Sequence, residues 1–384
     1  MNAIYLDNAA TTQMHPEVIE VMQNSMATNF GNPSSIHQFG RKAKSSVETA
    51  RKNIAKQFHV SAAEIIFTSS GTEADNLILN NAVLNLEVTR IITSKIEHHA
   101  VLNTCKFLSK KYDITLEFVL VKDNGDIDLE HLETLLKSSE EKTLVSLMMI
   151  NNEIGNVLPI KKVADLCKRH NSLFHSDTVQ AIGNYKLELS DINIDFLVGS
   201  AHKFHGPKGV GFAFFRKGFG ITPMIHGGEQ EKGARSSTEN VHAILGMEKA
   251  LNISYATIEK NKNYIETLKV YFISELKKIS KEIKFNGNSS NLDSSSATIL
   301  SVRFPVKNDM LLFSLDLLGI AVSGGSACQS GSNKGSHVLS EILFDGEEDK
   351  TSVRFSFSRN NTIEELDFAI TKIKDFIKQK KENL

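Results

Sequence analysis

The sequence predicts an α/β protein with a large domain built on a mostly parallel sheet and a smaller α+β domain. Short apolar runs alternate with segments of helical periodicity up to about residue 250, where a long charged helix begins a different pattern. The length agrees, because 384 residues with 41% hydrophobic composition exceed the roughly 250–300 residues that one core usually serves. We expect a large domain over 15–255 and a small domain over 256–384 that also includes 1–14.

Helices and buried strands alternate in the first domain. Apolar residues recur at three- and four-residue spacing within 18–26 and 43–58, which is typical of helices with one buried face. The apolar runs expected to form buried strands are EIIF (64–67), RIIT (90–93), LVSLMMI (144–150), LFHS (173–176) and FLVG (196–199). Helical patterns at 75–86, 99–111 and 161–170 supply the crossover connections that a parallel sheet requires.

The second domain combines long helices with a few strands. A charged helix is expected over 257–282, followed by the polar stretch NGNSSNLDSSS (286–296) and a strand, ATILSVRF (297–304). The segment EELDFAITKIKDFIKQKK (364–381) has one apolar face at helical spacing and is expected to pack on a second, smaller sheet.

Charge and composition exclude several classes of protein. Lys and Arg number 44 and Asp and Glu 45, so the chain lacks the basic excess with which nucleic-acid-binding proteins neutralise phosphates. No apolar run approaches the ~18–20 residues of a membrane span, and MNAIYLDNAATT lacks the pattern of a signal peptide. We therefore expect a soluble cytoplasmic protein. Three cysteines are too few for a disulfide framework or a Cys-rich zinc site, and no metal site is expected.

Polar residues follow several of the apolar runs, where strands of an open parallel sheet meet ligands. After EIIFT comes SSGTEADN (69–76), in which Gly71 and Thr72 begin a helix and could cradle a phosphate. The alternative is an ordinary loop with Thr72 as the helix cap.

Asp177 and Lys203 follow two further runs, LFHS and FLVGS. A carboxylate at the end of a buried strand needs a partner, because an unpaired charge there costs several kcal/mol. One alternative is a structural ion pair for Asp177 and a solvated charge for Lys203. About one strand–helix–strand unit separates the two residues, so both can reach the same crevice.

Several motifs, in order from about residue 4 to 370, resemble those of the cysteine desulfurases of the nitrogen-fixation and iron–sulfur-assembly type. The motifs are LDNAATT (6–12), GNPSSIH (31–37), SSGTEADN (69–76), SKIEHHAV (94–101), NNEIGNV (151–157), SDTVQAIG (176–183) and AHKFHGPKGVG (201–211). The resemblance implies the fold of aspartate aminotransferase with a seven-stranded sheet. It also implies pyridoxal 5′-phosphate (PLP) as cofactor, L-cysteine as substrate and a homodimer.

By that resemblance, Lys203 holds PLP and later moves the α-proton of the substrate, Asp177 pairs with the pyridine N–H, and His98 stacks on the ring as a proton shuttle. His98 rather than His99 is the match. Further implied contacts are Gly71, Thr72, Ser200 and His202 at the phosphate, Asn152 and Gln180 beside the phenolic oxygen, and Thr238, which reaches the phosphate from the second subunit. Just before Thr238, this chain has Ser237 where the family has glycine.

The resemblance also assigns the residues that bind substrate. Arg354, in SVRFSFS, matches the arginine that binds an amino acid's carboxylate, and Asn32, in GNPSS, assists it. The alternative for Arg354 is a surface charge on an edge strand.

The cysteines differ in their surroundings. Cys328 lies in the Gly- and Ser-rich run SGGSACQSGS (323–332), and by the resemblance it takes the sulfur of the substrate as a persulfide and leaves alanine. Cys105 and Cys167 lie on helical faces and are expected to be structural.

The implied activity is a PLP-dependent cysteine desulfurase that converts L-cysteine to L-alanine and passes sulfur from Cys328 to an acceptor protein. The acceptor would serve iron–sulfur cluster assembly or the synthesis of thiolated cofactors or tRNA, and KKENL (380–384) shows no match to the tail that docks a cluster scaffold. One alternative is a selenocysteine lyase or another aminotransferase-like PLP enzyme. An alternative from a different class is a non-catalytic sulfur-transfer or regulatory subunit.

Overall fold

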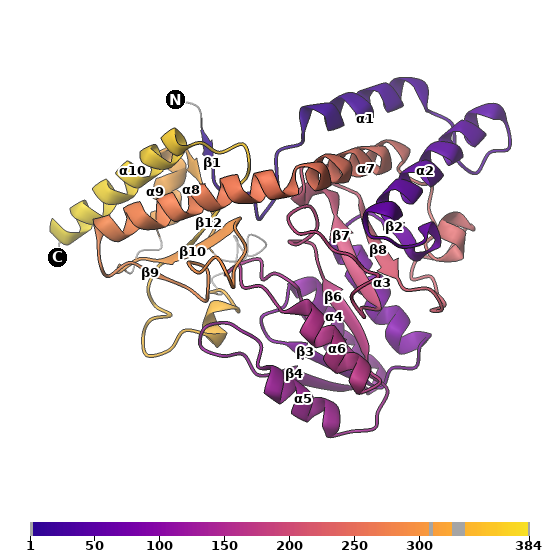
Figure 1. The fold of residues 1–384 in the computed structure, drawn as a ribbon, viewed down its shortest axis with the longest axis horizontal. Helices are drawn as coiled ribbons and strands as arrows, with labels where there is room; N and C mark the ends of the chain where they lie inside the picture. Colours follow the sequence, from indigo (N-terminus) through magenta and orange to yellow (C-terminus); the bar gives the residue numbers. More distant parts are fainter. Residues whose placement is uncertain (1–2, 307–309, 325–334, 383–384) are drawn as a thin grey trace.

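The computed structural model describes residues 3–306, 310–324 and 335–382, which form a large and a small domain (Figure 1). The large domain is built on a seven-stranded sheet in the order β2-β8-β7-β6-β5-β3-β4. Its strands are β2 (Ile65–Thr68), β3 (Arg90–Ser94), β4 (Thr115–Val119), β5 (Thr143–Ser146), β6 (Leu173–Asp177), β7 (Phe196–Ser200) and β8 (Gly211–Phe215). Neighbouring strands run parallel except for β8, which is antiparallel to β2 and β7. The expected α/β class with a mostly parallel seven-stranded sheet is therefore confirmed.

The expected strands include neither β4 nor β8, although β8 (GFAFF) is an apolar run that is buried throughout, and the expected strand 144–150 is longer than β5. Strand β4 lies at the edge of the sheet, where four of its five residues are partly or fully exposed, so no continuous apolar run marks it. The apolar run 144–150 leaves the regular strand after Ser146. The backbone N–H groups of Leu147 and Met149 still donate to the carbonyl oxygens of His175 and Asp177, at 3.1 and 2.9 Å.

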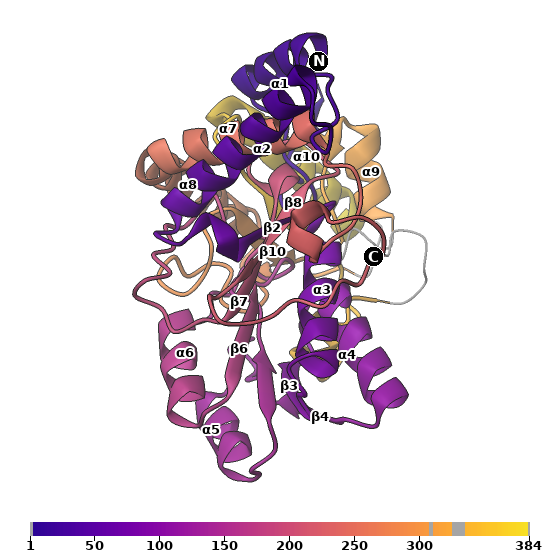
Figure 2. The ribbon, with the colours of Figure 1, turned by 90° about the vertical axis from the view of Figure 1, so that its right-hand side faces the viewer.

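Helices cover both faces of the sheet (Figure 2). The helices of the large domain are α1 (Pro16–Thr28), α2 (Gln38–Gln57), α3 (Gly71–Leu84), α4 (His99–Tyr112), α5 (Leu129–Lys137), α6 (Ile160–Arg169) and α7 (Val241–Ala256). Phe174 and Leu197 join the core shared with α2, α6 and α7, whereas Phe196 and Val198 join the core shared with α3 and α4. All four are fully buried, and each such side chain stabilises the fold by about 1.5–3 kcal/mol.

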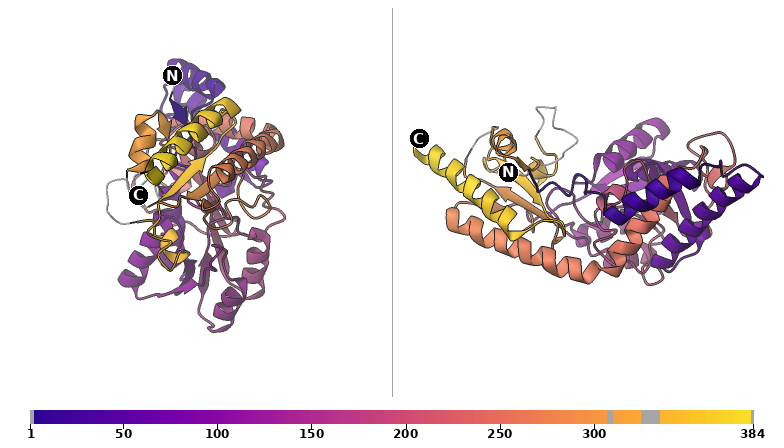
Figure 3. Two further views of the ribbon diagram at one scale, coloured as in Figure 1. Left: turned by 90° about the vertical axis from the view of Figure 1, so that its left-hand side faces the viewer. Right: turned by 90° about the horizontal axis from the view of Figure 1, so that it is seen from above.

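The small domain has its own sheet and core. Its elements are α8 (Ile258–Ile279), β9 (Lys284–Phe285), β10 (Ile299–Arg303), α9 (Leu311–Leu317), β11 (Ile320–Ala321), β12 (Ser352–Ser356) and α10 (Ile363–Glu382), joined by β1 (Ile4–Tyr5). Strand β10 pairs with β9 and β12, and β1 pairs in parallel with β11. Helices α8 and α10 lie side by side (Figure 3). The core joins Ile4 and Leu6 to residues of 265–377, which supports the proposed assignment of the N-terminal segment to the small domain.

The two domains are connected through consecutive helices. Thr257 alone separates α7 from α8, and its φ of −122° interrupts the helical path next to the proposed boundary at residue 256. In the described ranges, none of the helices has the length and apolar character needed to cross a membrane.

Candidate active site

The site lies at the edge of the large sheet where β6 and β7 end. A cavity of about 210 Å³ opens there, bordered by residues of both domains. Its lining consists of Ala9, Ala10, Ser70, Gly71, Thr72, Asp75, His98, Met148, Asn152, Asp177, Val179, Gln180, Ser200, His202, Lys203 and Arg354. Since the carboxyl ends of parallel strands meet at one edge of a sheet, segments far apart in the sequence deliver most of the predicted residues to this one cavity.

Lys203 is held at the cavity by the N-terminal segment. It ends the short 3₁₀ helix η2 (Ala201–Lys203), which follows β7 directly. Its Nζ donates to the carbonyl oxygens of Ala9 and Ala10, at 2.5 and 2.9 Å. Thr12 fixes the same segment, because its N–H and Oγ1 both donate to the carbonyl oxygen of His202, at 2.9 and 2.8 Å. The alternative that Lys203 is a solvated surface charge is therefore wrong, because its amine donates to two backbone oxygens at the cavity.

Asp177 is the last residue of β6 and is 6% exposed. Its Oδ1 accepts a hydrogen bond from the N–H of Val179 at 2.9 Å. Burial raises the pKa of Asp177, while the neighbouring His98 and Lys203 act in the opposite direction. Burial thus disfavours the charged carboxylate, which a cationic ligand group in the cavity would stabilise.

His98 caps α4 and presents its ring to the cavity. The Nδ1 atom accepts a hydrogen bond from the N–H of Ala100 at 3.2 Å, so the proton of the neutral ring is on Nε2. Burial lowers the pKa of His98, which favours this neutral form. His99, with its ring centroid 6.5 Å from that of His98, does not line the cavity.

The start of α3 provides an anion site. Ser70, not Thr72, is the cap, and its Oγ accepts from the N–H of Glu73 at 3.2 Å. The first N–H groups of the helix, at Gly71 and Thr72, belong to residues that line the cavity, where the helix dipole favours negative charge. A Cβ atom on Gly71 would lie 2.7 Å from Cγ2 of Val179, so the close approach requires glycine.

Two further predicted residues complete the anion side of the cavity. Ser200 ends β7 and is 2% exposed. Nδ1 of His202 lies 3.2 Å from Oγ1 of Thr11, and burial lowers the pKa of His202 to about 4. His202 is therefore neutral at physiological pH and can act there as a hydrogen-bonding partner rather than as a cation.

Arg354, in β12, enters the cavity from the small domain. Its Nη1 donates to the carbonyl oxygen of Asn152 at 2.7 Å and its Nη2 to Oδ1 of Asp7 at 2.9 Å. The residue is 2% exposed, and among the described residues its Nε has no partner. The alternative of a surface charge is wrong, because the guanidinium is buried and oriented by two acceptors. It keeps a free N–H donor for a carboxylate.

Gln180 and Asn152 also line the cavity. The Nε2 atom of Gln180 donates to the carbonyl oxygen of Ala9 at 2.9 Å, which is one of the two oxygens that hold Lys203. Asn152 uses its backbone oxygen for Arg354, so its side chain is positioned by a chain segment that the arginine fixes.

The remaining predicted residues lie elsewhere. Asn32 is in the connection between α1 and α2, where its Oδ1 accepts from the N–H of Ser34 at 2.9 Å, and it does not line the cavity. Thr238 lines a separate hollow beside Ser69, and a single chain does not bring it to its own cavity. Cys328 lies outside the described residues. Cys105 and Cys167 are buried, and burial raises the pKa of both thiols, as expected of structural cysteines.

Ser237 has an unusual backbone conformation. Its φ is 154°, a region that L side chains rarely adopt. We predict that Ser237→Gly raises the stability of the protein by about 1 kcal/mol, because relief of the backbone strain outweighs the greater entropy of the unfolded chain. Thermal unfolding would show this as a melting temperature about 2 °C higher.

A matched control for this prediction is Ser236→Gly. Ser236 is not among the residues with positive φ, and its Oγ donates to the carbonyl oxygen of Gly228 at 2.7 Å. The control should therefore lower the melting temperature. A lower melting temperature for Ser237→Gly would contradict the assignment of strain.

The structure adds a buried pair that the sequence reasoning missed. Oδ1 of Asp75, in α3, lies 3.4 Å from Nε2 of His175, whose Nδ1 lies 2.9 Å from Oγ of Ser146. Burial, and then the charges of Asp177 and Glu97, raise the pKa of Asp75 well above its usual range. Burial lowers the pKa of His175 to about 3. His175 is therefore neutral at physiological pH, and burial favours the protonated form of Asp75, which forms part of the cavity lining.

A signal for this pair is present in the sequence. Asp75 shares a helical face with Ile78, Leu79 and Ala82, so a carboxyl group interrupts an apolar stripe. His175 precedes Asp177 by two residues in a buried strand, which puts both side chains on one face of the sheet.

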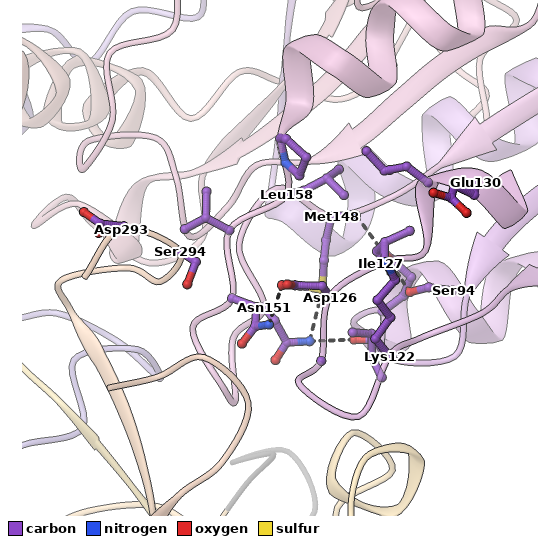
Figure 4. Close-up of a pocket in the computed structure, with 17 residues that line it drawn as sticks. Ser94, Lys122, Asp126, Ile127, Glu130, Met148, Asn151, Leu158, Asp293 and Ser294 are labelled. Atoms are coloured by element: carbon purple, nitrogen blue, oxygen red, sulfur yellow. Dashed lines mark hydrogen bonds between the residues drawn. The ribbon is translucent and has the colours of Figure 1, made fainter. Parts of the chain in front are cut away.

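A second cavity, about 520 Å³ in volume, adjoins the first through Met148, which lines both (Figure 4). It lies between loops of the large domain and the polar stretch of the small domain. Oδ1 of Asp126 accepts from Nδ2 of Asn156 at 3.0 Å and from Nδ2 of Asn288 at 2.8 Å, so this carboxylate joins the two domains. This cavity is larger than the first, but it lies at the interface between the two domains. The predicted reactive residues line the smaller cavity, which is therefore the candidate active site.

Known proteins share both the sequence and the fold. The family model described as aminotransferase class-V matches residues 4–368. A protein named cysteine desulfurase IscS, from Dictyoglomus turgidum, is 40% identical over 379 residues, which cover 98% of this chain and 95% of that protein. The solved structure of a NifS-like protein has a TM-score of 0.90 and 37% identity, with 98% of this chain and 99% of that chain covered. Another, described as SspA in complex with cysteine, has a TM-score of 0.80 and 31% identity, with 94% and 100% covered.

Proposed function

The chain belongs to the aminotransferase class-V family and, within it, to the cysteine desulfurases, and from this premise we propose that it converts L-cysteine to L-alanine and transfers the sulfur. The observation that carries the proposal is the convergence of Lys203, Asp177 and Arg354 on one cavity. An amine, a buried carboxyl group and a guanidinium with a free N–H are the groups needed for a PLP enzyme that acts on an amino acid.

The residues that line the cavity fit PLP. The N–H groups of Gly71 and Thr72 suit its phosphate, Lys203 supplies the amine that would hold it, and Asp177 suits its ring nitrogen. Buried polar atoms without a partner among the described residues, including Nε of Arg354, also belong to residues of the lining. A homodimer would add Thr238 of the second subunit at the phosphate.

The reaction assigns a task to each side chain. Arg354 binds the substrate carboxylate, and Nζ of Lys203 takes the α-proton. The chemistry that PLP supplies when bound is the withdrawal of electrons from the substrate carbon atoms. The thiolate of Cys328 attacks the substrate sulfur, so that an S–S bond forms as the C–S bond breaks. The electron pair of the C–S bond stays on the β-carbon, which takes one proton, and Nζ of Lys203 returns a proton to the α-carbon, so that alanine is formed.

The persulfide on Cys328 then passes its sulfur to an acceptor protein of iron–sulfur cluster assembly or of thio-cofactor or tRNA synthesis. The test is a product assay of the purified protein with L-cysteine and a thiol reductant, and then with candidate acceptors. We expect equal amounts of alanine and sulfide without any keto acid. A requirement for a keto-acid acceptor would indicate transamination, and inactivity without a second protein would indicate a subunit of a complex.

Arg354→Lys is predicted to raise the KM for L-cysteine by about 10–100-fold, because lysine keeps the charge but loses the guanidinium N–H that donates to the substrate carboxylate, a contact worth roughly 1.5–3 kcal/mol. Steady-state kinetics would measure it. Arg303→Lys is the matched control, since Arg303 lies in the same small sheet but pairs with Glu347 at 3.0 Å, and its KM should be unchanged. An unaltered KM for Arg354→Lys would remove the arginine from substrate binding.

A further inference from the structure

Residues 335–343, here called the return segment, follow the stretch that contains Cys328 and pack against the large domain. Oγ of Ser336 donates to Oε2 of Glu153 and accepts from the N–H of Leu339 at 3.0 Å. Glu153 is 1% exposed and adjoins Asn152, which lines the cavity. The return segment is therefore attached to a loop that forms part of the site.

His337 makes a second attachment. Its Nε2 donates to the carbonyl oxygen of Glu97 at 2.9 Å, and its ring centroid lies 4.4 Å from that of His99. Glu97 and His99 flank His98 in the sequence. Nδ1 of His337 faces Oε1 of Glu153 at 3.9 Å, and both atoms are buried without a hydrogen-bond partner among the described residues. A proton shared between these two atoms would join them.

Apolar packing completes the attachment. Val338, Ile342 and Leu343 form a small core with Ile96 and Ile154. Burying such side chains contributes about 1.5–3 kcal/mol each, so this packing favours the attached position of the return segment.

The other end of the stretch is also tied to the site. Ser323 and Arg354 exchange two backbone hydrogen bonds. The N–H of Ser323 donates to the carbonyl oxygen of Arg354 at 3.3 Å, and the N–H of Arg354 donates to the carbonyl oxygen of Ser323 at 2.7 Å. Both ends of the stretch that contains Cys328 are thus bound to neighbours of the cavity, one through the strand of the substrate arginine and one through Glu153 and His337.

We propose that Glu153 and His337 are positioning residues that fix the return segment against the large domain and so determine where Cys328 meets the substrate sulfur. The proposal rests on the proposed function, because only a reaction at Cys328 needs this placement. Misplacement of a reacting group by about 1 Å can cost on the order of 100-fold in rate.

The experiment compares the holoenzymes of His337→Ala, Glu153→Ala and Glu153→Gln with the unmodified protein. We expect kcat for sulfide release to fall by about 10–100-fold in both alanine variants, with the KM for cysteine and the Kd for PLP within about twofold. Glu153→Gln should retain kcat within about threefold, because its amide accepts from Ser336 and can donate to Nδ1 of His337. Ser340→Ala, which removes only an exposed hydroxyl bonded to the oxygen of His337, is the matched control and should leave kcat unchanged.

A second measurement separates this inference from the proposed function. The rate at which iodoacetamide alkylates Cys328 should rise at least about threefold in His337→Ala, because a looser attachment lets the thiol sample more positions. Cys105 and Cys167 are buried and react slowly. Unchanged kcat and alkylation in both alanine variants would overturn the proposal, as would a fall in kcat matched by weaker binding of PLP. If the unmodified protein released no sulfide, the proposed function would fail, while the alkylation rates would still decide the role of His337.

Discussion

Lys203→Ala is expected to abolish the visible absorbance of bound PLP and to lower the rate of alanine formation by about 10⁴-fold. The structure places Nζ of Lys203 within 2.5 and 2.9 Å of two backbone oxygens at the cavity. The alanine side chain has no amine, so it can neither hold the cofactor nor take the α-proton of the substrate. Absorbance spectra and a chromatographic assay of alanine would measure the two effects.

Lys208→Ala is the matched control for this prediction. Lys208 lies five residues further along the same motif but is exposed and does not line the cavity. Its removal should leave both the spectrum and the rate unchanged. Alanine formation at the normal rate by Lys203→Ala would exclude this lysine from the chemistry.

Cys328→Ser is expected to keep the PLP spectrum but to lower sulfide release by about 10³-fold or more, because a hydroxyl group is a much weaker nucleophile than a thiolate. Mass spectrometry of the protein after reaction with cysteine should show one added sulfur atom in the unmodified chain and none in the variant. These two readouts separate the loss of the sulfur acceptor from the loss of the cofactor site.

The control for the cysteine prediction is Cys167→Ala. Cys167 is 1% exposed and burial raises the pKa of its thiol, so its removal should affect stability rather than sulfur transfer. Sulfide release unaffected by Cys328→Ser would show that another group takes the sulfur.

The fold was predictable where burial leaves a continuous pattern in the sequence. Strands β6 and β7 are almost entirely buried because helices cover both of their faces, and the apolar residues with which each strand begins make them visible as short runs. Strand β4 was not predictable in this way, since its place at the edge of the sheet mixes Thr115 and Glu117 with apolar residues. The end of β5 at Ser146 depends on tertiary hydrogen bonds that no local pattern records.

The site was predictable to the extent that it is built from strand ends. Lys203 and Asp177 were found by position, and Arg354 by resemblance alone, because its burial depends on Asp7 and Asn152 from distant segments. The roles of Asn32 and Thr238 could not be predicted from strand ends, because within one chain neither residue lines the cavity.

The N-terminal segment has a consequence for synthesis of the protein. Ile4 pairs with Ile320, and Nδ2 of Asn8 donates to the carbonyl oxygen of Ser356 at 2.9 Å, while the next residues hold Lys203. A ribosome adds about 5–20 residues per second, so residues 4–8 wait on the order of 20–70 s for their partners at 320–356. A nascent chain that has not yet produced β12 therefore lacks the partners that fix its N-terminal segment beside Lys203.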